Sequence, residues 1–408
     1  MIETAGEWFS RVLAGYARQR ILAQIHSDFK VHGSGRRLYR MKVTRIEAYP
    51  VSMPLSMPFA TSLGQLPSQK GHVIVAVETD EGIQGFGEAA PDPIYHGESQ
   101  ETILQVIKKY LAPSLIGADP FDFENILEKE NRSIVGNPYA CAAIDLALYD
   151  IMGKKTGLPA CKLLGGRVRD RIPVVFVLSL AKKIEDIASE AEDCVKRGYK
   201  TLKIKVGVDP GLDLERVGVV REKVGDSVDI RVDANQGWTP DIAIKLIKKM
   251  ERYDLQLVEQ PVPGWDLEGM ARVTKAVDTP VMADESVFSP QMALRVVKME
   301  AADIINIKIM KPGGLYNSKK IASIAEAADI PCVVGSMLET GIGTAAGAHF
   351  ASANRIVKYP CEMIGPAYFK TDLIKEDIRP KDGFVSVPSK PGLGVTPNID
   401  VIKKLSPT

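Results

Sequence analysis

The chain has 408 residues, of which 45% are hydrophobic and 25% are charged, and its formal net charge is +1. A chain of this length exceeds a usual single core, so we expect two domains or one large barrel with additions. The balanced charge gives no footprint for nucleic acid or an anionic membrane, and no apolar run approaches the roughly 20 residues of a membrane-spanning helix. Five scattered cysteines without a Cys-x-x-Cys pair are typical of reduced thiols in a cytosol. The sequence therefore predicts a cytoplasmic protein that binds neither nucleic acid nor a membrane.

Residues 1–40 differ from the rest of the chain. Apolar residues recur at helical spacing from Trp8 to Tyr16, and the basic stretch from His32 to Arg37 then breaks the pattern. We interpret this segment as an N-terminal extension without a chemical role.

Residues 41–165 are predicted to form a separate α+β domain. A strand is expected at 42–52, where Pro50 restricts it to an edge or an end. A hairpin of two strands, 72–79 and 83–88, follows around the turn at Asp80-Glu-Gly82. Helices are then expected over 99–116, 120–130 and 138–156. Strands first and helices afterwards favour the α+β class.

From Arg171 onward, strands and amphipathic helices alternate strictly. Eight near-parallel strands with helical crossovers predict a closed (β/α)-type barrel over residues 166–364. An open doubly wound sheet is the rival, but the stretch Leu178-Ser-Leu-Ala181 lacks the Gly-rich turn of that fold. Residues 365–408 are expected to leave the barrel, form a short strand at 384–387 and return to the first domain. The predicted barrel strands are 173–179, 201–206, 230–235, 255–260, 281–286, 304–309, 332–337 and 359–364.

Charged residues end five successive barrel strands. They are separated by 28, 26, 25 and 24 residues, which is the length of a strand, a helix and two short loops. Catalytic side chains of such barrels lie at the C-terminal ends of strands, and all five positions obey that rule. The five residues are Lys205, Asp233, Glu259, Asp284 and Lys308.

The three acids, Asp233, Glu259 and Asp284, are predicted to bind a divalent metal. Buried carboxylates without a cation would repel one another and be costly to desolvate. Hard oxygen ligands suit Mg²⁺, with Mn²⁺ as an alternative ion. The competing interpretation, helix caps or loop ion pairs, is weakened by three such residues at matched spacing.

Lys205 and Lys308 are predicted to exchange a proton with the substrate. An unperturbed lysine has a pKa of about 10.4 and is no base at neutral pH. A nearby cation and the neighbouring ammonium of Lys203, two residues before Lys205 on the same strand face, are expected to lower that pKa. A substrate carboxylate held on the metal would present its α-carbon to a base on each side, and the metal would stabilise the enediolate. Ordinary surface lysines are the alternative.

Further residues beside these positions are predicted to bind substrate or support the site. Asn235 and Gln260 each lie beside a predicted ligand position, and Glu339 lies two residues past Met337 on the seventh predicted strand. The predicted set is Lys203, Asn235, Gln260, Glu285, Ser336, Glu339 and Thr61.

These motifs resemble the enolase superfamily, and within it the muconate lactonizing (cycloisomerase) subgroup of the mandelate racemase/muconate lactonizing enzyme family. The resemblance spans roughly residues 41–398 and implies an α+β capping domain on a modified (β/α)₇β barrel. It also implies Mg²⁺ on the three acids, acid/base lysines at 205 and 308, and a cap loop, 53–72, that closes over a small carboxylate substrate. We also expect a homo-oligomer. The motifs are Lys203-Ile-Lys205, Asp233-Ala-Asn235, Glu259-Gln260-Pro261, Asp284-Glu285-Ser286 and Asn306-Ile-Lys308-Ile-Met-Lys311.

The resemblance leaves the substrate open among muconate cycloisomerases, dipeptide epimerases, N-acylamino acid racemases and o-succinylbenzoate synthases. Dipeptide epimerases typically carry an Asp-x-Asp on the last strand that binds the substrate's α-ammonium, whereas this chain has Cys361-Glu362-Met-Ile. The loop Phe59-Ala-Thr-Ser-Leu63 also has no arginine to bind a second carboxylate. We therefore expect a muconate cycloisomerase-like isomerase. Two other classes stay open: a Schiff-base lyase and a non-catalytic binding protein.

Overall fold

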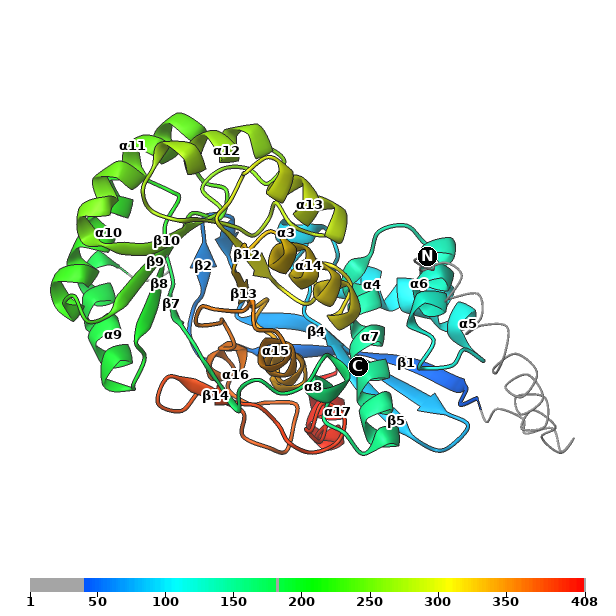
Figure 1. Cartoon of the computed structure of the whole chain (residues 1–408). Coiled ribbons are helices and arrows are strands. Elements are labelled where there is room, and N and C mark those ends of the chain that lie inside the picture. The colour runs from blue at the N-terminus through cyan, green and yellow to red at the C-terminus, as the bar shows by residue number, and fades with distance from the viewer. Residues whose placement is uncertain (1–39, 181–182, 407–408) are drawn as a thin grey trace, which may run out of the picture. The chain divides into compact units, whose positions relative to one another are not determined.

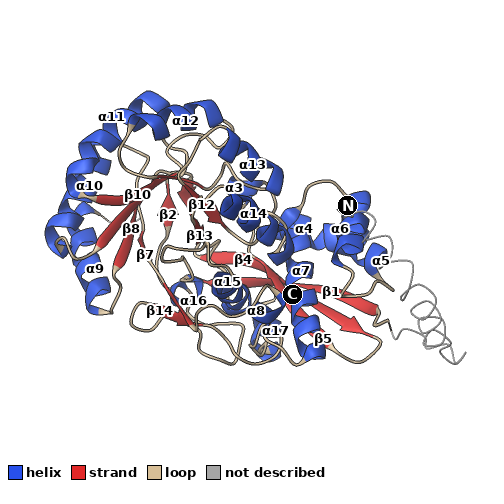
Figure 2. Cartoon of the chain, in the orientation of Figure 1, coloured by secondary structure: helices blue, strands red, loops and turns tan. Residues whose placement is uncertain are grey.

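The computed structural model describes residues 40–180 and 183–406 (Figure 1). The predicted N-terminal extension, apart from Arg40, lies outside the described residues. None of the helices in the described part of the chain is both long and apolar enough to span a bilayer. Helices and strands follow one another in the order expected from the sequence, with an antiparallel sheet first and a curled parallel sheet afterwards (Figure 2).

The first domain is built on a three-stranded antiparallel sheet in the order β1-β4-β5. Its strands are β1 (Val43–Pro54), β4 (Gln69–Thr79) and β5 (Gln84–Ala89). The predicted hairpin is confirmed, and β1 is an edge strand, as Pro50 indicated. Two short strands, β2 (Ala60–Thr61) and β3 (Gly64–Gln65), pair within the loop between β1 and β4.

Helix α7 (Pro138–Thr156) packs on this sheet and has the predicted bounds. The approach is close because β5 carries glycines where the helix passes. A Cβ at Gly87 would lie 1.9 Å from the Ala143 carbonyl oxygen, and one at Gly85 would lie 2.2 Å from that of Ala147. A side chain at either position would push the helix off the sheet.

The helix predicted over 99–116 is divided in three. It runs as α4 (Gln100–Val106), a π-helical turn η1 (Ile107–Leu111) and α5 (Ala112–Leu115). Pro113 has no N–H and its ring clashes with the carbonyl four residues earlier, so the regular helix cannot continue through it. The next predicted helix is shifted and appears as α6 (Phe123–Ser133).

The second sheet has seven parallel strands in the order β13-β12-β11-β10-β9-β8-β7, and helices connect them. The strands are β7 (Phe176–Leu178), β8 (Thr201–Lys205), β9 (Asp229–Asp233), β10 (Leu255–Glu259), β11 (Val281–Ala283), β12 (Ile304–Ile307) and β13 (Cys332–Val334). The connecting helices are α9 (Ile184–Lys196), α10 (Pro210–Val224), α11 (Pro240–Met250), α12 (Leu267–Ala276), α13 (Pro290–Lys298) and α14 (Leu315–Ala327), and α15 (Gly341–Ala353) follows β13. Four short elements complete the order: α3 (Pro93–His96) follows β5, α8 (Ala160–Leu163) follows α7, η2 (Glu251–Tyr253) follows α11, and α16 (Gly365–Tyr368) follows α15.

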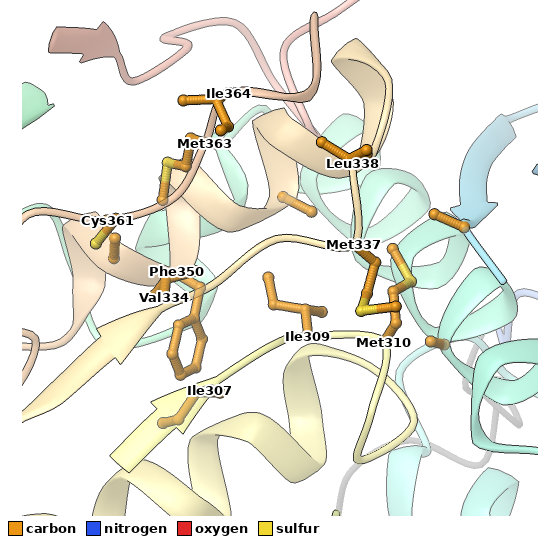
Figure 3. Packing of buried hydrophobic residues seen from close by; sticks show 14 of the residues in the cluster. Ile307, Ile309, Met310, Val334, Met337, Leu338, Phe350, Cys361, Met363 and Ile364 are labelled. Atoms are coloured by element: carbon orange, nitrogen blue, oxygen red, sulfur yellow. The ribbon is translucent and has the colours of Figure 1, made fainter. Parts of the chain in front are cut away.

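The predicted eighth strand, 359–364, is not a regular strand. Single parallel bridges join Val174 to Cys361 and Cys332 to Val357, so this segment connects the two edges of the curled sheet. The Cys361 carbonyl accepts from Val175 N at 3.0 Å. Pro360 lacks an N–H and cannot donate to a ladder, which explains the irregular pairing. Figure 3 shows Cys361 and Met363 in the core with Ile307, Val334 and Phe350.

The predicted first barrel strand, 173–179, is also divided. Its start, β6 (Arg171–Pro173), pairs antiparallel with β14 (Phe384–Ser386), and only β7 joins the parallel sheet. The C-terminal segment then runs back along the first domain, where Leu393 N donates to Asp150 Oδ1 at 2.9 Å. The last described helix is α17 (Ile399–Leu405).

Candidate active site

The five predicted charged residues gather at one edge of the parallel sheet. Lys205, Asp233 and Glu259 are the last residues of β8, β9 and β10, whereas Asp284 and Lys308 come directly after β11 and β12. Neighbouring strands are parallel, so their C-terminal ends share this edge. All five side chains are buried, with at most 6% of any residue exposed.

Lys203 lies at the centre of an ion network beneath this edge. Its Nζ is 2.6 Å from Glu259 Oε2, 2.7 Å from Glu362 Oε1 and 2.9 Å from Asp233 Oδ2. Burial disfavours the ammonium, but the three carboxylates, led by Asp233, outweigh it and raise the pKa of Lys203. Lys203 therefore holds acids from two barrel strands and from the closing segment together.

Lys205 contacts the acids on one side of the site. Its Nζ is 2.6 Å from Asp233 Oδ2 and donates to Asn235 Oδ1 at 2.8 Å. Asn235 in turn donates to Glu285 Oε1 at 3.0 Å. Burial and the nearby Asp284 raise the pKa of Glu285 to about 7. Its buried Oε2 has no hydrogen-bond partner among the described residues.

Lys308 mirrors this arrangement on the other side. Its Nζ is 2.7 Å from Asp284 Oδ2 and donates to the Tyr95 hydroxyl at 2.8 Å. That hydroxyl itself donates to Asp284 Oδ2. The second oxygen of Asp284 accepts from Lys311 Nζ at 2.6 Å. Tyr95 belongs to α3, so the first domain contributes directly to this side.

Burial and ion pairing act in opposite directions on these groups. Burial raises the pKa of Asp233, but the ammonium groups of Lys203 and Lys205 outweigh it and lower that pKa to about 2. Lys308 and Lys311 lower the pKa of Asp284 in the same way. Burial also disfavours the charged form of Lys308, yet the neighbouring acids raise its pKa, which is opposite to the expected lowering. The lysine faces carboxylates here, and the expectation assumed a cation beside it.

The three predicted metal ligands, Asp233, Glu259 and Asp284, lie within this ion network. Among the described residues, no three acidic, histidine or cysteine side chains form a ready-made metal group, because lysines stand between Asp233, Glu259 and Asp284. The donor chemistry nevertheless fits a hard cation. Burial raises the pKa of Glu259, and the charge of Asp233 adds to this, so a divalent ion bound here would stabilise the carboxylate form.

A cavity opens above the strand ends, and it brings together part of the predicted set. The predicted residues Lys205, Asn235, Lys308, Ser336 and Thr61 line it. The other predicted residues do not. Gln260 accepts from Asp284 N at 2.9 Å and from Ser286 N at 3.1 Å, so it fixes the loop after β11.

Glu339 is also held away from this cavity. Ser336 Oγ donates to one of its oxygens at 2.6 Å and Met337 N to the other at 3.0 Å. It lines a separate small cavity with Glu362. Glu339 therefore shapes the loop that carries Ser336.

The loop between β1 and β4 covers the cavity from the side of the first domain. Ser62 Oγ donates to the carbonyl oxygens of Ala234 and Asn235 at 2.8 and 2.9 Å. Ala60 N donates to Ser179 Oγ at 2.7 Å. The loop is thus fixed to the ends of β7 and β9 and places apolar side chains such as Phe59 against the cavity.

Sequence reasoning missed the residues that the first domain and the end of the lysine motif supply. Lys311, three residues after Lys308, binds Asp284, and the sequence pattern does not predict this role. Tyr95 and Lys70 also line the cavity. Tyr95 lies in a short helix and Lys70 within a strand. Neither local pattern predicts that the side chain reaches the barrel.

Comparison with known proteins agrees with this geometry. Residues 43–165 match the mandelate racemase/muconate lactonizing enzyme N-terminal domain, and residues 186–401 match the enolase C-terminal domain-like family. The chain is 42% identical to L-Ala-D/L-Glu epimerase of Bacillus subtilis over 87% of this chain and 97% of that protein. It is 40% identical to N-succinyl-L-Arg/Lys racemase of Bacillus cereus (90% and 98%) and 35% identical to muconate cycloisomerase 1 of Rhodococcus opacus (89% and 98%).

Solved structures of such relatives have a similar fold. The crystal structure of the Bacillus cereus racemase superposes with a TM-score of 0.87 at 39% identity, covering 90% of this chain and 98% of that one. A dipeptide epimerase from Enterococcus faecalis V583, complexed with Mg and the dipeptide L-Leu-L-Tyr, superposes with a TM-score of 0.84 at 37% identity (87% and 99%).

The fold and the relatives define an isomerase of the enolase superfamily. The chain belongs to the mandelate racemase/muconate lactonizing enzyme family. The expected fold class, a barrel with an α+β cap, is confirmed.

Proposed function

We propose that this isomerase inverts the α-carbon of an N-acylated amino acid. The observation that carries the proposal is that Lys205 and Lys308 line one cavity from β8 and β12, with three strands between them. A substrate carboxylate between the two lysines would expose its α-carbon to one ammonium or amine on each face. One lysine would take the α-proton and the other would return a proton to the opposite face.

Hydrogen bonds from the two lysines would hold each of them on its own side of the substrate. Asn235 orients Lys205, and the Tyr95 hydroxyl orients Lys308. Asp233, Glu259 and Asp284 would hold Mg²⁺, and the bound ion would stabilise negative charge on the substrate carboxylate. Ion binding would require the ammonium groups of Lys203 and Lys205 to give up part of their contact with Asp233.

An acylated nitrogen suits the site better than a free α-ammonium. The last barrel segment offers Glu362 where dipeptide epimerases carry two aspartates, and Glu362 is already paired with Lys203 at 2.7 Å. A substrate ammonium would have to compete with that buried pair. An amide nitrogen carries no charge and makes no such demand.

Muconate cycloisomerisation is the second candidate. The segment Cys361–Pro366 resembles the cycloisomerase ending, and the Rhodococcus relative is 35% identical. Identities of 40 and 42% to a racemase and an epimerase support placing it second, which reverses the order expected from the sequence.

The test is a substrate screen with proton exchange as the readout. N-succinyl-L-lysine, N-succinyl-L-phenylalanine, L-Ala-L-Glu and muconate are incubated with the protein and Mg²⁺ in D₂O, and ¹H NMR follows the α-proton. Exchange with inversion of an N-succinyl amino acid supports the proposal, and lactone formation from muconate supports the second candidate. Trapping of a substrate by borohydride would contradict both, because a proton-transfer mechanism leaves no reducible imine. No exchange and no turnover would leave a non-catalytic binding protein.

A further inference from the structure

Lys70 differs from every other buried lysine of the described chain. Four of the five form an ion pair with a carboxylate. Lys70 forms none with the described residues, and its one hydrogen bond to them goes from Nζ to the Pro91 carbonyl oxygen at 2.8 Å. The five are Lys70, Lys203, Lys205, Lys308 and Lys311.

An ammonium in this position has hydrogen-bond donors that the described residues do not use. It has three donors, of which the Pro91 carbonyl takes one, and only 5% of the residue is exposed. A buried charge without a partner is unfavourable. Burial accordingly lowers the pKa of Lys70.

The acids around Lys70 are bound elsewhere. Glu88 accepts hydrogen bonds from Thr340 N and Gly343 N, both at 2.7 Å, and pairs with His72 Nδ1 at 2.8 Å. Asp92 accepts from Ile94 N at the start of α3. Glu339, described above, is held by its own loop. No protein acid therefore neutralises Lys70 directly, although the charges of all three reach it.

Lys70 also faces the substrate cavity. It lies on β4 of the first domain and lines the same cavity as Lys205 and Lys308. Much of the remaining wall is apolar, including Leu66, Ile94 and Leu338. Two acids also line the cavity: Glu362, which is paired with Lys203, and Asp92, which accepts from Ile94 N. An anionic group entering this part of the cavity would meet one unpaired ammonium in a low-dielectric surrounding, where a charge-assisted hydrogen bond is strong.

We propose that Lys70 binds a second carboxylate of the substrate, distal to the one between Lys205 and Lys308. The inference rests on the proposed function in placing the reacting carboxylate between those two lysines. It makes the substrate a dianion, such as an N-acylated amino acid with an acidic acyl group. Lys70, on strand β4, would thus bind the second carboxylate in place of an arginine, which the cap loop lacks.

Binding of simple dicarboxylates tests this without turnover. Glutarate, adipate and pimelate are titrated calorimetrically into the full chain with Mg²⁺, each beside its monoamide. Wild type is expected to bind one diacid at least about tenfold more tightly than its monoamide, the size expected for a hydrogen bond to a charged group. Lys70→Met should remove the preference and Lys70→Arg should keep part of it. Lys109→Met, an exposed lysine of the same domain, should leave it unchanged.

A purely structural role for Lys70 gives a different result. If Lys70 only holds the Pro91 carbonyl, and through it α3, Lys70→Met would weaken diacid and monoamide binding equally. That outcome, or a wild-type protein that shows no preference for any diacid, overturns the proposal. Absence of α-proton exchange with every substrate would contradict the proposed function and leave this binding comparison intact.

Discussion

The two walls of the cavity are built on different principles. On the barrel wall, every lysine at the strand ends meets a carboxylate, and Lys203 and Lys311 lock the acids in place from beneath. On the cap wall, apolar side chains dominate, and Lys70 forms no ion pair with the described residues. In the proposed function, the barrel wall would therefore supply the fixed charges for proton transfer. The cap wall, whose charged lining residues are Lys70 and Asp92, would help to select the substrate.

The largest expected effect lies on the barrel wall. Lys205→Ala removes one of the two proposed proton carriers, so α-proton exchange should fall by roughly 10²- to 10⁴-fold. NMR exchange rates measure this. Lys200→Ala, an exposed lysine just before β8, is the control and should retain the wild-type rate. Equal rates in Lys205→Ala and wild type would remove Lys205 from the mechanism.

Lys203 is expected to matter for stability as well. Lys203→Met leaves Asp233, Glu259 and Glu362 without their shared cation, and breaking a buried pair costs about 3–5 kcal/mol. Urea denaturation should show this loss. A second change, Glu362→Gln, should restore part of it, whereas the exposed Lys196→Met should change little. If the free energy of unfolding falls by less than about 1 kcal/mol, the three carboxylates do not depend on Lys203 as their shared cation.

Tyr95 of the cap contacts Lys308 of the barrel wall. Removing its hydroxyl should slow α-proton exchange less than removing Lys205. Tyr95→Phe keeps the ring against Lys308, whose Nζ lies 4.3 Å from the ring centroid, but deletes the hydroxyl between Lys308 and Asp284. We expect exchange to slow by about tenfold, as for one hydrogen bond to a charged group. The exposed Tyr110→Phe is the matched control. An unchanged exchange rate would show that Lys308 needs no support from the cap.

Substitution of Glu130, which lies away from the cavity, should have the smallest effect, a change in how stability depends on pH. Burial, with the charge of Asp145, raises its pKa to about 8, while the Cys141 thiol acts against this. Between the unfolded pKa near 4.5 and about 8, the folded state holds an extra proton, so stability should fall as pH rises. Glu130→Gln should flatten this slope by about 1 kcal/mol between pH 7 and 8. The exposed Glu128→Gln should keep the wild-type slope, and a Glu130→Gln slope equal to wild type would contradict the buried neutral acid.

The barrel wall was predictable from the sequence because parallel strands repeat at near-constant spacing. That repeat alone predicts that Lys205, Asp233 and Glu259 lie at one edge of the sheet. The cap wall follows no repeat: Tyr95 and Lys70 reach the cavity through the packing of one domain on another, which local patterns do not encode. Irregular strands were missed for a local reason, since Pro360 interrupts pairing in a segment whose apolar composition favours a strand.

The proposed mechanism places two lysines on opposite faces of one α-carbon. It is tested most directly by α-proton exchange of Lys205→Arg and Lys308→Arg, measured separately from each enantiomer of one N-succinyl amino acid in D₂O. Each variant should lose exchange from one enantiomer, and that enantiomer should differ between the two variants. Loss of the same enantiomer in both variants, or undiminished exchange from both enantiomers, would contradict it.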